Sequence, residues 1–509
     1  MLKFLSFFGL LFCLVISQSC KTVQIQAPAP SNPETTLTSS FPRMAAEWEP
    51  ATGVFITWPL AIPHKLVIEL AKDTRVYTLV PSLEEKQSAT TWFKKWGIGM
   101  EKIEFIVAPQ GVDSWWTRDW GPHAVYSVKD GMRMADGMYV NSTPVSGLDC
   151  NDKLRHLFTK ENEKGEVEII PTTTDDLAPY EIGKALNIEV VELPFVFTGG
   201  NVIADGRGSV FSTCVITNEN RFMKVSDEAF FNSADALLGV DQYRLISNFE
   251  ENGIQHIDCY LKLIDEETLF VLRPPKDHPS FQVYEDIVNN ELAKMKNAYG
   301  RPYKILRLDT DIYHGRELAA YTNSLILNTT VYVPLFGINQ DVIALKQWQD
   351  ALPGYTVKGF LFELDKEPIL DPKAQKHYYK IGWNSGDALH CRTRAMWDPQ
   401  MLYMSVDRLP ENVAHSSGYT VQANVIDYSN KGFVDGSLLL HWREAGGEWG
   451  SEPLRAMAEK GNWLGIIPSQ EPGDLIEYYI SAKSHSGREE MMPRSAPAGV
   501  YRFRINGKE

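Results

Sequence analysis

A small set of reactive side chains stands in separate polar segments of the chain. The set contains one thiol, one imidazole and two carboxylates: Cys391, His256, Asp119 and Asp258. A thiol beside an imidazole is a nucleophile with a proton partner. A cysteine protease would need no further carboxylates, because negative charges disfavour both a thiolate and an oxyanion. Two carboxylates instead suit a planar guanidinium cation, whose forked N–H groups match carboxylate oxygens two bonds at a time.

Each member of this set is a weak signal when taken alone. An Asp at the start of a strand usually belongs to a turn, and a single Cys is usually a buried core residue. His256 and Asp258 are two positions apart, so a β-strand would place both side chains on one face. The set can form one acidic cleft only if the fold brings the separate segments together.

The segments recur at roughly regular intervals, and each opens a pair of β-type runs followed by helix-like sequence. Four copies begin at Asp119, Gly199, His256 and Asn323, and a fifth combines 53–58 with 388–393. Such β-β-α units, with polar residues at the same end of each first strand, predict an α/β fold of radial blades around a shared axis. A conventional α/β sheet with coincidental spacing is the alternative.

Composition limits the class of protein. The chain has 509 residues, of which 44% are hydrophobic and 23% are charged, as in globular proteins. The formal net charge of −15 argues against a nucleic-acid partner, because phosphate binding requires a basic surface. There is no CxxC pair, so no metal site is predicted. The cysteines beyond the first 20 residues are expected to be free thiols: Cys150, Cys214, Cys259 and Cys391.

The first residues of the chain have the pattern of an export signal. Lys3 precedes an apolar run over 4–16, and small residues lead up to Cys20. This pattern predicts a signal peptide over 1–19 and lipidation of Cys20, which begins a flexible tether over 20–42. Cleavage without lipidation is the alternative. No later run reaches about 18 apolar residues, so we expect contact with a membrane only through the lipid anchor.

The pattern of apolar and polar residues changes after about residue 400. Short alternating runs are separated by turn signals there, and none of them contains a cysteine. This pattern is typical of an immunoglobulin-like β-sandwich without its disulfide. We therefore predict a catalytic domain over 43–400 and a sandwich domain over 401–509.

Five ordered motifs carry a family resemblance: WTRDWGP at 116–122, TGGNVIADG at 198–206, HIDCYLK at 256–262, YTNSLIL at 321–327 and ALHCRTR at 388–394. They resemble the bacterial peptidylarginine deiminase and agmatine deiminase family of the guanidine-modifying pentein superfamily, with the closer match to the Porphyromonas type. The resemblance implies a five-bladed α/β propeller with pseudo-fivefold ββαβ repeats. It also implies a hydrolase that converts a guanidine into a ureido group and ammonia, as in arginine to citrulline.

The resemblance implies a role for each member of the reactive set. Cys391 would be the nucleophile. His256 would protonate the leaving ammonia and then activate water, the usual double role of an imidazole. Asp119 and Asp258 would bind the nitrogens of the guanidinium group.

The same motifs imply three supporting roles. Asn323 would orient groups near the thiol. Trp116 would line the pocket, where an indole face favours a cation. The turn at 199–201 would shape the rim of the site, and neither a metal nor a cofactor is implied.

The substrate stays open between arginine-containing peptides or proteins and a small guanidine. An exported lipoprotein of the cell envelope, periplasmic or on the outer-membrane surface, would meet peptidyl arginine, which is the first prediction. Agmatine, hydrolysed for putrescine synthesis, is the alternative. The loop at 141–149 lacks the arginine pair that resembling enzymes use to read a peptide C-terminus, so we expect little preference for terminal arginine. An amidinotransferase and a catalytically inactive surface binding protein complete the alternatives.

Overall fold

The computed structural model describes most of the chain from residue 42 onward. The described residues are 42–109, 112, 114–139, 142–144, 154–157, 159–161, 167–169, 175–250, 254–362, 370, 382–383 and 387–507. The predicted signal peptide, Cys20 and nearly all of the predicted tether lie outside them, as does most of the loop at 141–149. No helix among the described residues is long and apolar enough to cross a membrane.

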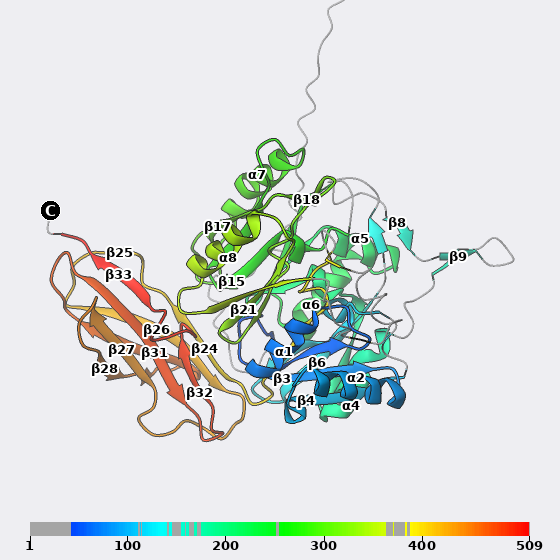
Figure 1. The fold of residues 1–509 in the computed structure, drawn as a ribbon. Coiled ribbons are helices and arrows are strands. Elements are labelled where there is room, and N and C mark those ends of the chain that lie inside the picture. Colours follow the sequence, from blue (N-terminus) through cyan, green and yellow to red (C-terminus); the bar gives the residue numbers. More distant parts are fainter. Residues whose placement is uncertain are drawn as a thin grey trace, which may run out of the picture. The chain divides into compact units, whose positions relative to one another are not determined.

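Five small sheets of the described chain share one connectivity. Each sheet contains a middle strand, called its second strand, that pairs antiparallel with one neighbour, the first strand, and parallel with the other, the third strand. Two of the sheets carry a fourth strand at one edge. At least one α-helix lies between the second strand and the third (Figure 1). The mixed α/β fold predicted from the sequence is therefore confirmed.

Hydrogen bonds join the strands of each sheet in the following order. The first sheet contains β23 (Arg394–Trp397), β2 (Ala51–Thr57), β3 (Arg75–Val80) and β4 (Ile103–Val107). The second contains β1 (Arg43–Met44), β5 (His123–Ser127), β6 (Gly131–Met138) and β11 (Val190–Val196). The third contains β12 (Ile203–Ala204), β13 (Ser209–Thr213) and β14 (Gln242–Ile246). The fourth contains β15 (Leu261–Asp265), β16 (Thr268–Arg273) and β17 (Lys304–Asp309), and the fifth β20 (Leu325–Leu327), β21 (Thr330–Leu335) and β22 (Thr356–Leu361).

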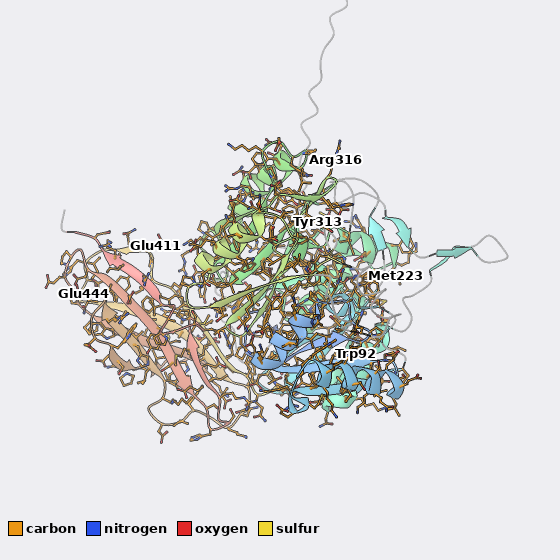
Figure 2. The ribbon with its side chains drawn as sticks, in the orientation of Figure 1. Trp92, Met223, Tyr313, Arg316, Glu411 and Glu444 are labelled. Atoms are coloured by element: carbon orange, nitrogen blue, oxygen red, sulfur yellow. The ribbon has the colours of Figure 1, made fainter. Side chains whose placement is uncertain are left out.

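The longer helices lie in the connections between neighbouring parallel strands of these sheets. They are α1 (His64–Asp73), α2 (Leu83–Lys95), α4 (Ala178–Leu186), α5 (Val215–Phe222), α6 (Asp227–Leu238), α7 (Phe281–Asn290) and α8 (Gln340–Ala351). Helix α2 shows how the sequence sets a boundary: the Ser82 side chain accepts a hydrogen bond from the N–H of Glu85, as in a capping box. Trp92 on this helix packs against the main hydrophobic core (Figure 2).

The first sheet joins two distant parts of the chain. Strand β23 pairs antiparallel with β2, with Ala395 opposite Val54. The core strands of this sheet are nearly continuous apolar runs, as in β3, because helices and neighbouring strands cover both faces. The last strand of the region from residue 43 to about 400 thus pairs with a strand near the beginning of that region.

The strands after residue 400 form two further sheets. One contains β24 (Leu402–Asp407), β26 (Gly418–Asp427), β30 (Asn462–Pro468) and β29 (Arg455–Ala456). The other contains β25 (Asn412–Val413), β33 (Tyr501–Ile505), β31 (Leu475–Lys483), β27 (Leu439–Glu444), β28 (Gly450–Pro453) and β32 (Glu489–Met492). The strands of both sheets lie toward the C-terminal, red end of the colour scale in Figure 1. Their inward side chains form one hydrophobic cluster.

The expectation of four free thiols is wrong for Cys214, which is disulfide-bonded. Cys259 and Cys391 are free and buried. Cys150 lies outside the described residues, as does the partner of Cys214. Wide spacing along the sequence gives no sign of which cysteines meet, so this bond could not be predicted.

Arg43 holds together residues that are far apart in the sequence. Its guanidinium group donates to both carboxylate oxygens of Glu49, at 2.7 and 2.9 Å, and to the Tyr428 hydroxyl at 2.9 Å. The guanidinium carbon also lies 3.8 Å from the ring centroid of Tyr403. Arg43 is only 2% exposed, so its charge depends on these partners.

We predict that Arg43→Met destabilises the fold by about 3–5 kcal/mol, because it leaves the Glu49 carboxylate buried without a cation. Urea unfolding followed by circular dichroism measures the change. The matched control is Arg75→Met, whose partner Glu104 lies at 3.4 Å in an exposed pair worth about 0–1 kcal/mol. Equal stability losses in the two variants would contradict the prediction.

Candidate active site

The predicted site residues lie in turns that immediately precede the first strands of the small sheets. Asp119 lies in the short helix α3 (Thr117–Trp120), before β5. Asp258 lies in the 3-10 turn η4 (Ile257–Cys259), before β15, and His256 precedes that turn. Asn323 and Cys391 precede β20 and β23 in the same way. The expectation that His256 and Asp258 share the face of a strand is therefore wrong.

Backbone hydrogen bonds connect these turns to one another. The N–H of Arg118 donates to the carbonyl of Cys391 at 3.0 Å, and the N–H of His390 donates to the carbonyl of Asn323 at 3.0 Å. The Asn323 side-chain oxygen also accepts from the N–H groups of His390 and Cys391, at 2.9 and 3.2 Å. The turns are therefore fixed relative to one another before any side chain reacts.

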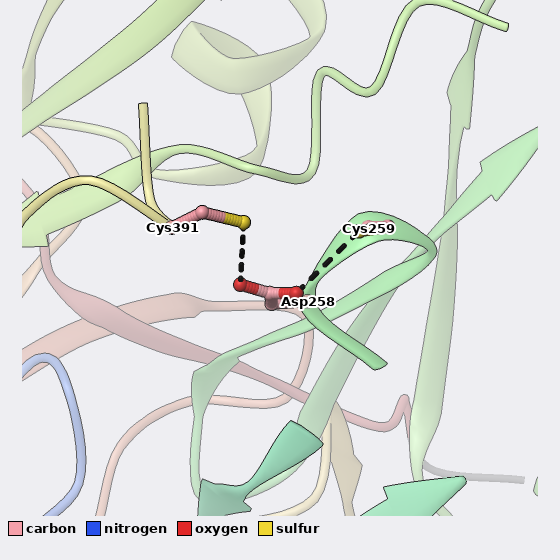
Figure 3. A group of neighbouring side chains, drawn as sticks. All are labelled: Asp258, Cys259 and Cys391. Carbon is pink, nitrogen blue, oxygen red and sulfur yellow. Dashed lines mark hydrogen bonds between the residues drawn. The ribbon is translucent and has the colours of Figure 1, made fainter. Parts of the chain in front are cut away.

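The thiol of Cys391 lies against an amide and a carboxylate. Asn323 Nδ2 donates to Cys391 Sγ at 3.2 Å, and Cys391 Sγ lies 3.7 Å from Asp258 Oδ2 (Figure 3). All three side chains are at most 4% exposed. Asn323 and Asp258 therefore both lie next to the sulfur of Cys391.

The second carboxylate meets the imidazole at Gly200. His256 Nδ1 lies 3.4 Å from Asp119 Oδ1, which also accepts the N–H of Gly200 at 3.0 Å. A Cβ added to Gly200 would lie 2.4 Å from Asp119 Oδ1, 2.8 Å from His256 Nδ1 and 3.5 Å from Asp258 Oδ2. The three side chains thus converge on one point, where only glycine fits.

The turn at 199–201 is buried inside the site, and the expectation that it shapes the rim is wrong. Besides the Gly200 contact, the Asn201 side-chain oxygen accepts the N–H of Ile257 at 3.2 Å and that of Thr213 at 2.9 Å. This turn therefore positions the segment that carries Asp258.

Electrostatics set the protonation of the imidazole. Burial lowers the pKa of His256, but the charge of Asp119, the contact with that carboxylate and the charge of Asp258 outweigh burial and raise the pKa to about 9. A distance of 3.4 Å is long for a hydrogen bond, so attraction between charges dominates. His256 is thus a cation at neutral pH.

The same carboxylates also raise the pKa of the Cys391 thiol. They favour the charged form of the imidazole and disfavour the charged form of the sulfur. A hydrogen bond with Cys259 lowers the pKa of Cys391, but burial and the charges of Asp258 and Asp119 outweigh it and raise the pKa to about 11. The resting sulfur is therefore a thiol at neutral pH. A cation placed between it and the two carboxylates would favour the thiolate.

Sequence reasoning missed a second layer of charged residues behind Asp258. His390 Nδ1 lies 2.6 Å from Asp258 Oδ2, and His390 Nε2 lies 2.7 Å from Glu47 Oε2. Lys262 Nζ reaches the same Glu47 oxygen at 2.9 Å. Lys262 and His390 lie within motifs that the sequence offers, HIDCYLK and ALHCRTR, whereas Glu47 lies in none.

This layer keeps Asp258 ionised. Burial raises the pKa of Asp258, but the hydrogen bond and charge of His390 outweigh it and lower the pKa. Burial and Arg118 lower the pKa of His390 itself. Nevertheless, ionised carboxylates on both ring nitrogens can be satisfied together only by the doubly protonated ring, and the two short contacts favour that form.

One group of side chains could hold a metal ion. Asp258, Cys259 and Cys391 are the one set of His, Cys, Asp or Glu residues in the described chain whose ligand atoms all lie within 4.8 Å of one another (Figure 3). Two thiols and a carboxylate suit a soft divalent cation such as Zn²⁺. Such an ion would occupy the Cys391 sulfur, so the group can bind metal or react through that thiol, but not both at once.

Trp116 is half-buried just before helix α3, and its ring pairs with that of Trp115 at 5.4 Å. It therefore stands three residues before Asp119. Cys20 lies outside the described residues.

Comparison with known protein families identifies the family of this chain. Residues 43–363 match the Porphyromonas-type peptidyl-arginine deiminase family. The chain belongs to this family. The resemblance inferred from the five motifs is confirmed, and so is the prediction of a hydrolase that acts on the C–N bonds of linear amidines.

Relatives of this deiminase carry the name agmatine deiminase. The proteins from Mycoplasma mycoides and Lactococcus lactis are each 25% identical to it, over 62% of this chain and 89% of their own. Among solved structures, the agmatine deiminase of Enterococcus faecalis is 20% identical, with a TM-score of 0.50 over 70% of this chain and 95% of its own. A second structure described as an agmatine deiminase has a TM-score of 0.52 and 20% identity, over 70% of this chain and 96% of its own. The similarity to these two structures supports the mixed α/β fold described above.

We predict that Asp119→Asn lowers the pKa of His256 from about 9, because the nearest negative charge is lost. NMR titration of histidine-labelled protein measures the pKa. The pKa in the folded state lies above the ordinary value of 6.5, so the protonated ring stabilises the fold fully below pH 6.5. That stabilisation is lost as the pH rises through about 9.

The control for this titration is Asp350→Asn, an exposed carboxylate on α8. It should leave the pKa of His256 unchanged. An unaltered pKa in Asp119→Asn would show that His256 owes its charge to another group.

Proposed function

We propose that this deiminase hydrolyses the guanidinium group of agmatine, giving a ureido product and ammonia. The observation that carries the proposal is the convergence of one thiol, one cationic imidazole and two buried carboxylates. This set suits a positively charged, planar substrate whose carbon must be attacked by sulfur. The names of the relatives from several bacteria support agmatine over other guanidines.

Asp119 and Asp258 bind the substrate cation through its N–H groups. Charge-assisted bonds of this kind hold the guanidinium plane in a fixed orientation. The bound charge offsets the two carboxylates, and the pKa of the Cys391 thiol falls from about 11. The thiol proton leaves to solvent, and the thiolate faces the central carbon.

Cys391 Sγ then attacks the guanidinium carbon and forms a C–S bond. His256, which carries a proton at neutral pH, gives that proton to the departing nitrogen as the C–N bond breaks. Ammonia leaves, and a covalent thiouronium stays on the sulfur. The now neutral His256 takes a proton from water, which adds to the same carbon, and the C–S bond breaks to give the ureido product and the thiol.

Asn323 and Trp116 act as supporting residues in this proposal. Asn323 fixes the sulfur through its 3.2 Å contact. Trp116 lines the approach to the guanidinium group with its indole ring. The shared connectivity of the five small sheets supports the five-bladed propeller, and the two sheets around one core after residue 400 support the immunoglobulin-like sandwich.

Peptidyl arginine is the second candidate substrate, and two observations favour it. The matching family is named for peptidyl-arginine deiminase. The disulfide at Cys214 fits an oxidising compartment, where such bonds persist. It therefore supports export, and we propose that the exported protein is lipidated at Cys20.

We expect Cys391→Ala to abolish ureido formation while the fold is retained, because loss of a nucleophile costs on the order of 10⁶ in rate. A colorimetric ureido assay with agmatine, without any added amine acceptor, measures turnover and separates hydrolysis from amidino transfer. Cys259→Ala is the matched control, since it removes the neighbouring thiol. An inactive Cys259→Ala beside an active Cys391→Ala would move the nucleophile to Cys259.

A substrate panel decides between the two candidates. We predict a higher kcat/KM for agmatine than for peptides with internal, C-terminal or amidated C-terminal arginine. Among the peptides, the terminal and amidated forms should react alike, because the loop at 141–149 offers no arginine pair for a carboxylate. Faster turnover of any peptide than of agmatine would make peptidyl arginine the substrate.

A further inference from the structure

A second acidic cavity lies apart from the residues that surround Cys391. Its volume is about 450 Å³, and we call it the acidic pocket. It is lined by Asp136 and Met138 of β6, Asp176, Leu177, Tyr180 of α4 and Glu192 of β11. None of these residues belongs to the proposed chemistry.

Asp136 is the unusual member of this pocket. The residue is 6% exposed, and neither a hydrogen bond nor a cation is among the causes that shift its pKa. Its register partner on the parallel strand β11 is Glu192, another carboxylate. Buried carboxylates are normally paired or bind a cation, so one that lines a cavity points to a ligand.

The surrounding charges reinforce this requirement. Burial, followed by the charges of Asp176 and Glu192, raises the pKa of Asp136 to about 8. No cation of the described chain is among the groups that act on it. The Tyr180 hydroxyl donates to Glu192 Oε2 at 3.3 Å and so adds no positive charge.

The geometry favours an organic cation over a metal ion. Three carboxylates line the pocket, but their oxygens are not all within 4.8 Å of one another, as those of a compact metal site in the described chain would be. Among the described residues, the other lining side chains are Met138, Leu177 and the half-exposed ring of Tyr180. Apolar walls and separated carboxylates suit an alkyl chain that ends in a positive charge.

The acidic pocket and the proposed catalytic site are built on adjoining elements. Met138 of strand β6 lines the pocket, and helix α3, which carries Asp119, contacts the same strand. The N–H of Tyr139, the residue that follows β6, donates to Asp176 at 2.8 Å.

We propose that the acidic pocket is a second cation site, which holds an ammonium or guanidinium group on an alkyl chain against Asp136 and Glu192. The cation belongs either to a small amine or to a basic side chain of a peptide. Because binding can be measured without turnover, this proposal can be tested independently of the proposed reaction.

Isothermal titration calorimetry with 1,5-diaminopentane tests the site, since this diamine has no guanidinium group to react. Asp136→Asn keeps the shape of the side chain and should weaken binding about tenfold to a hundredfold, the range for a charge-assisted bond. Glu192→Gln, at an exposed position, provides a second variant that should fold in any case. Asp130→Asn, in the turn between β5 and β6, is the control and should bind as the unaltered protein does.

Proton release adds a readout that a structural role for Asp136 would not affect. Asp136 is mostly protonated at pH 7, so an arriving cation should displace up to about one proton. Titrations in two buffers with different ionisation enthalpies give this number. Asp136→Asn should release none.

The variant Asp119→Asn locates the bound diamine. Binding that survives Asp119→Asn and is weakened by Asp136→Asn supports the proposal. Binding that is lost in Asp119→Asn and kept in both pocket variants places the diamine at the proposed catalytic site and overturns the proposal. No heat of binding at about 10 mM diamine also overturns it.

Peptide kinetics distinguish the two sources of the cation. Asp136→Asn should raise KM for an arginine peptide that carries a second lysine, relative to the same peptide with glutamine, if the cation is a peptide side chain. Equal changes for both peptides, together with diamine binding, assign the pocket to a small amine.

Discussion

The structure around the proposed active site depends on burying two acidic side chains and giving each of them polar partners. Asp119 and Asp258 are at most 4% exposed, and an isolated buried charge is strongly unfavourable. Each is therefore surrounded by donors from other segments. Asp119 receives the N–H of Gly200 and faces the His256 cation, while Asp258 contacts His390, which is held in turn by Glu47. The Cys391 thiol therefore lies against one of these carboxylates, 3.7 Å from Asp258 Oδ2.

The repeated topology explains how so many segments reach one place. Each small sheet begins with a short strand, and the turn before that strand carries a polar side chain. Because the donors are turns and not strand interiors, their N–H groups are free to bind across to neighbours, as between Arg118 and Cys391. The shared connectivity thus brings polar turns from different sheets into hydrogen-bond contact with one another.

The structure brings together the side chains that the sequence singled out, because their segments repeat and each precedes the first strand of a sheet. Cys391, His256, Asp119, Asp258 and Asn323 were all found from polar clusters at the starts of β-type runs. The local backbone was harder: His256 and Asp258 alternate as in a strand, yet the N–H of Cys259 returns to the carbonyl of His256 and closes a turn. A period of two over three residues cannot distinguish these conformations.

Contacts between distant, unremarkable residues could not be predicted from the sequence. Glu47 belongs to no motif, and only the fold shows that its carboxylate joins His390 to Lys262. The same is true of Asp136, whose raised pKa is a property of its surroundings. Long-range pairing, and not local propensity, decides such cases.

The pairing of β23 with β2 has a consequence for synthesis. Cys391 lies just before β23, the strand that completes the first sheet. Glu47 and Asp119 lie much earlier in the chain. A nascent chain acquires its sulfur only after the other members of the site have emerged, and loop closure over this span is slow. A nascent chain therefore carries no complete site until Cys391 has emerged, while the strands after residue 400 are still to be made.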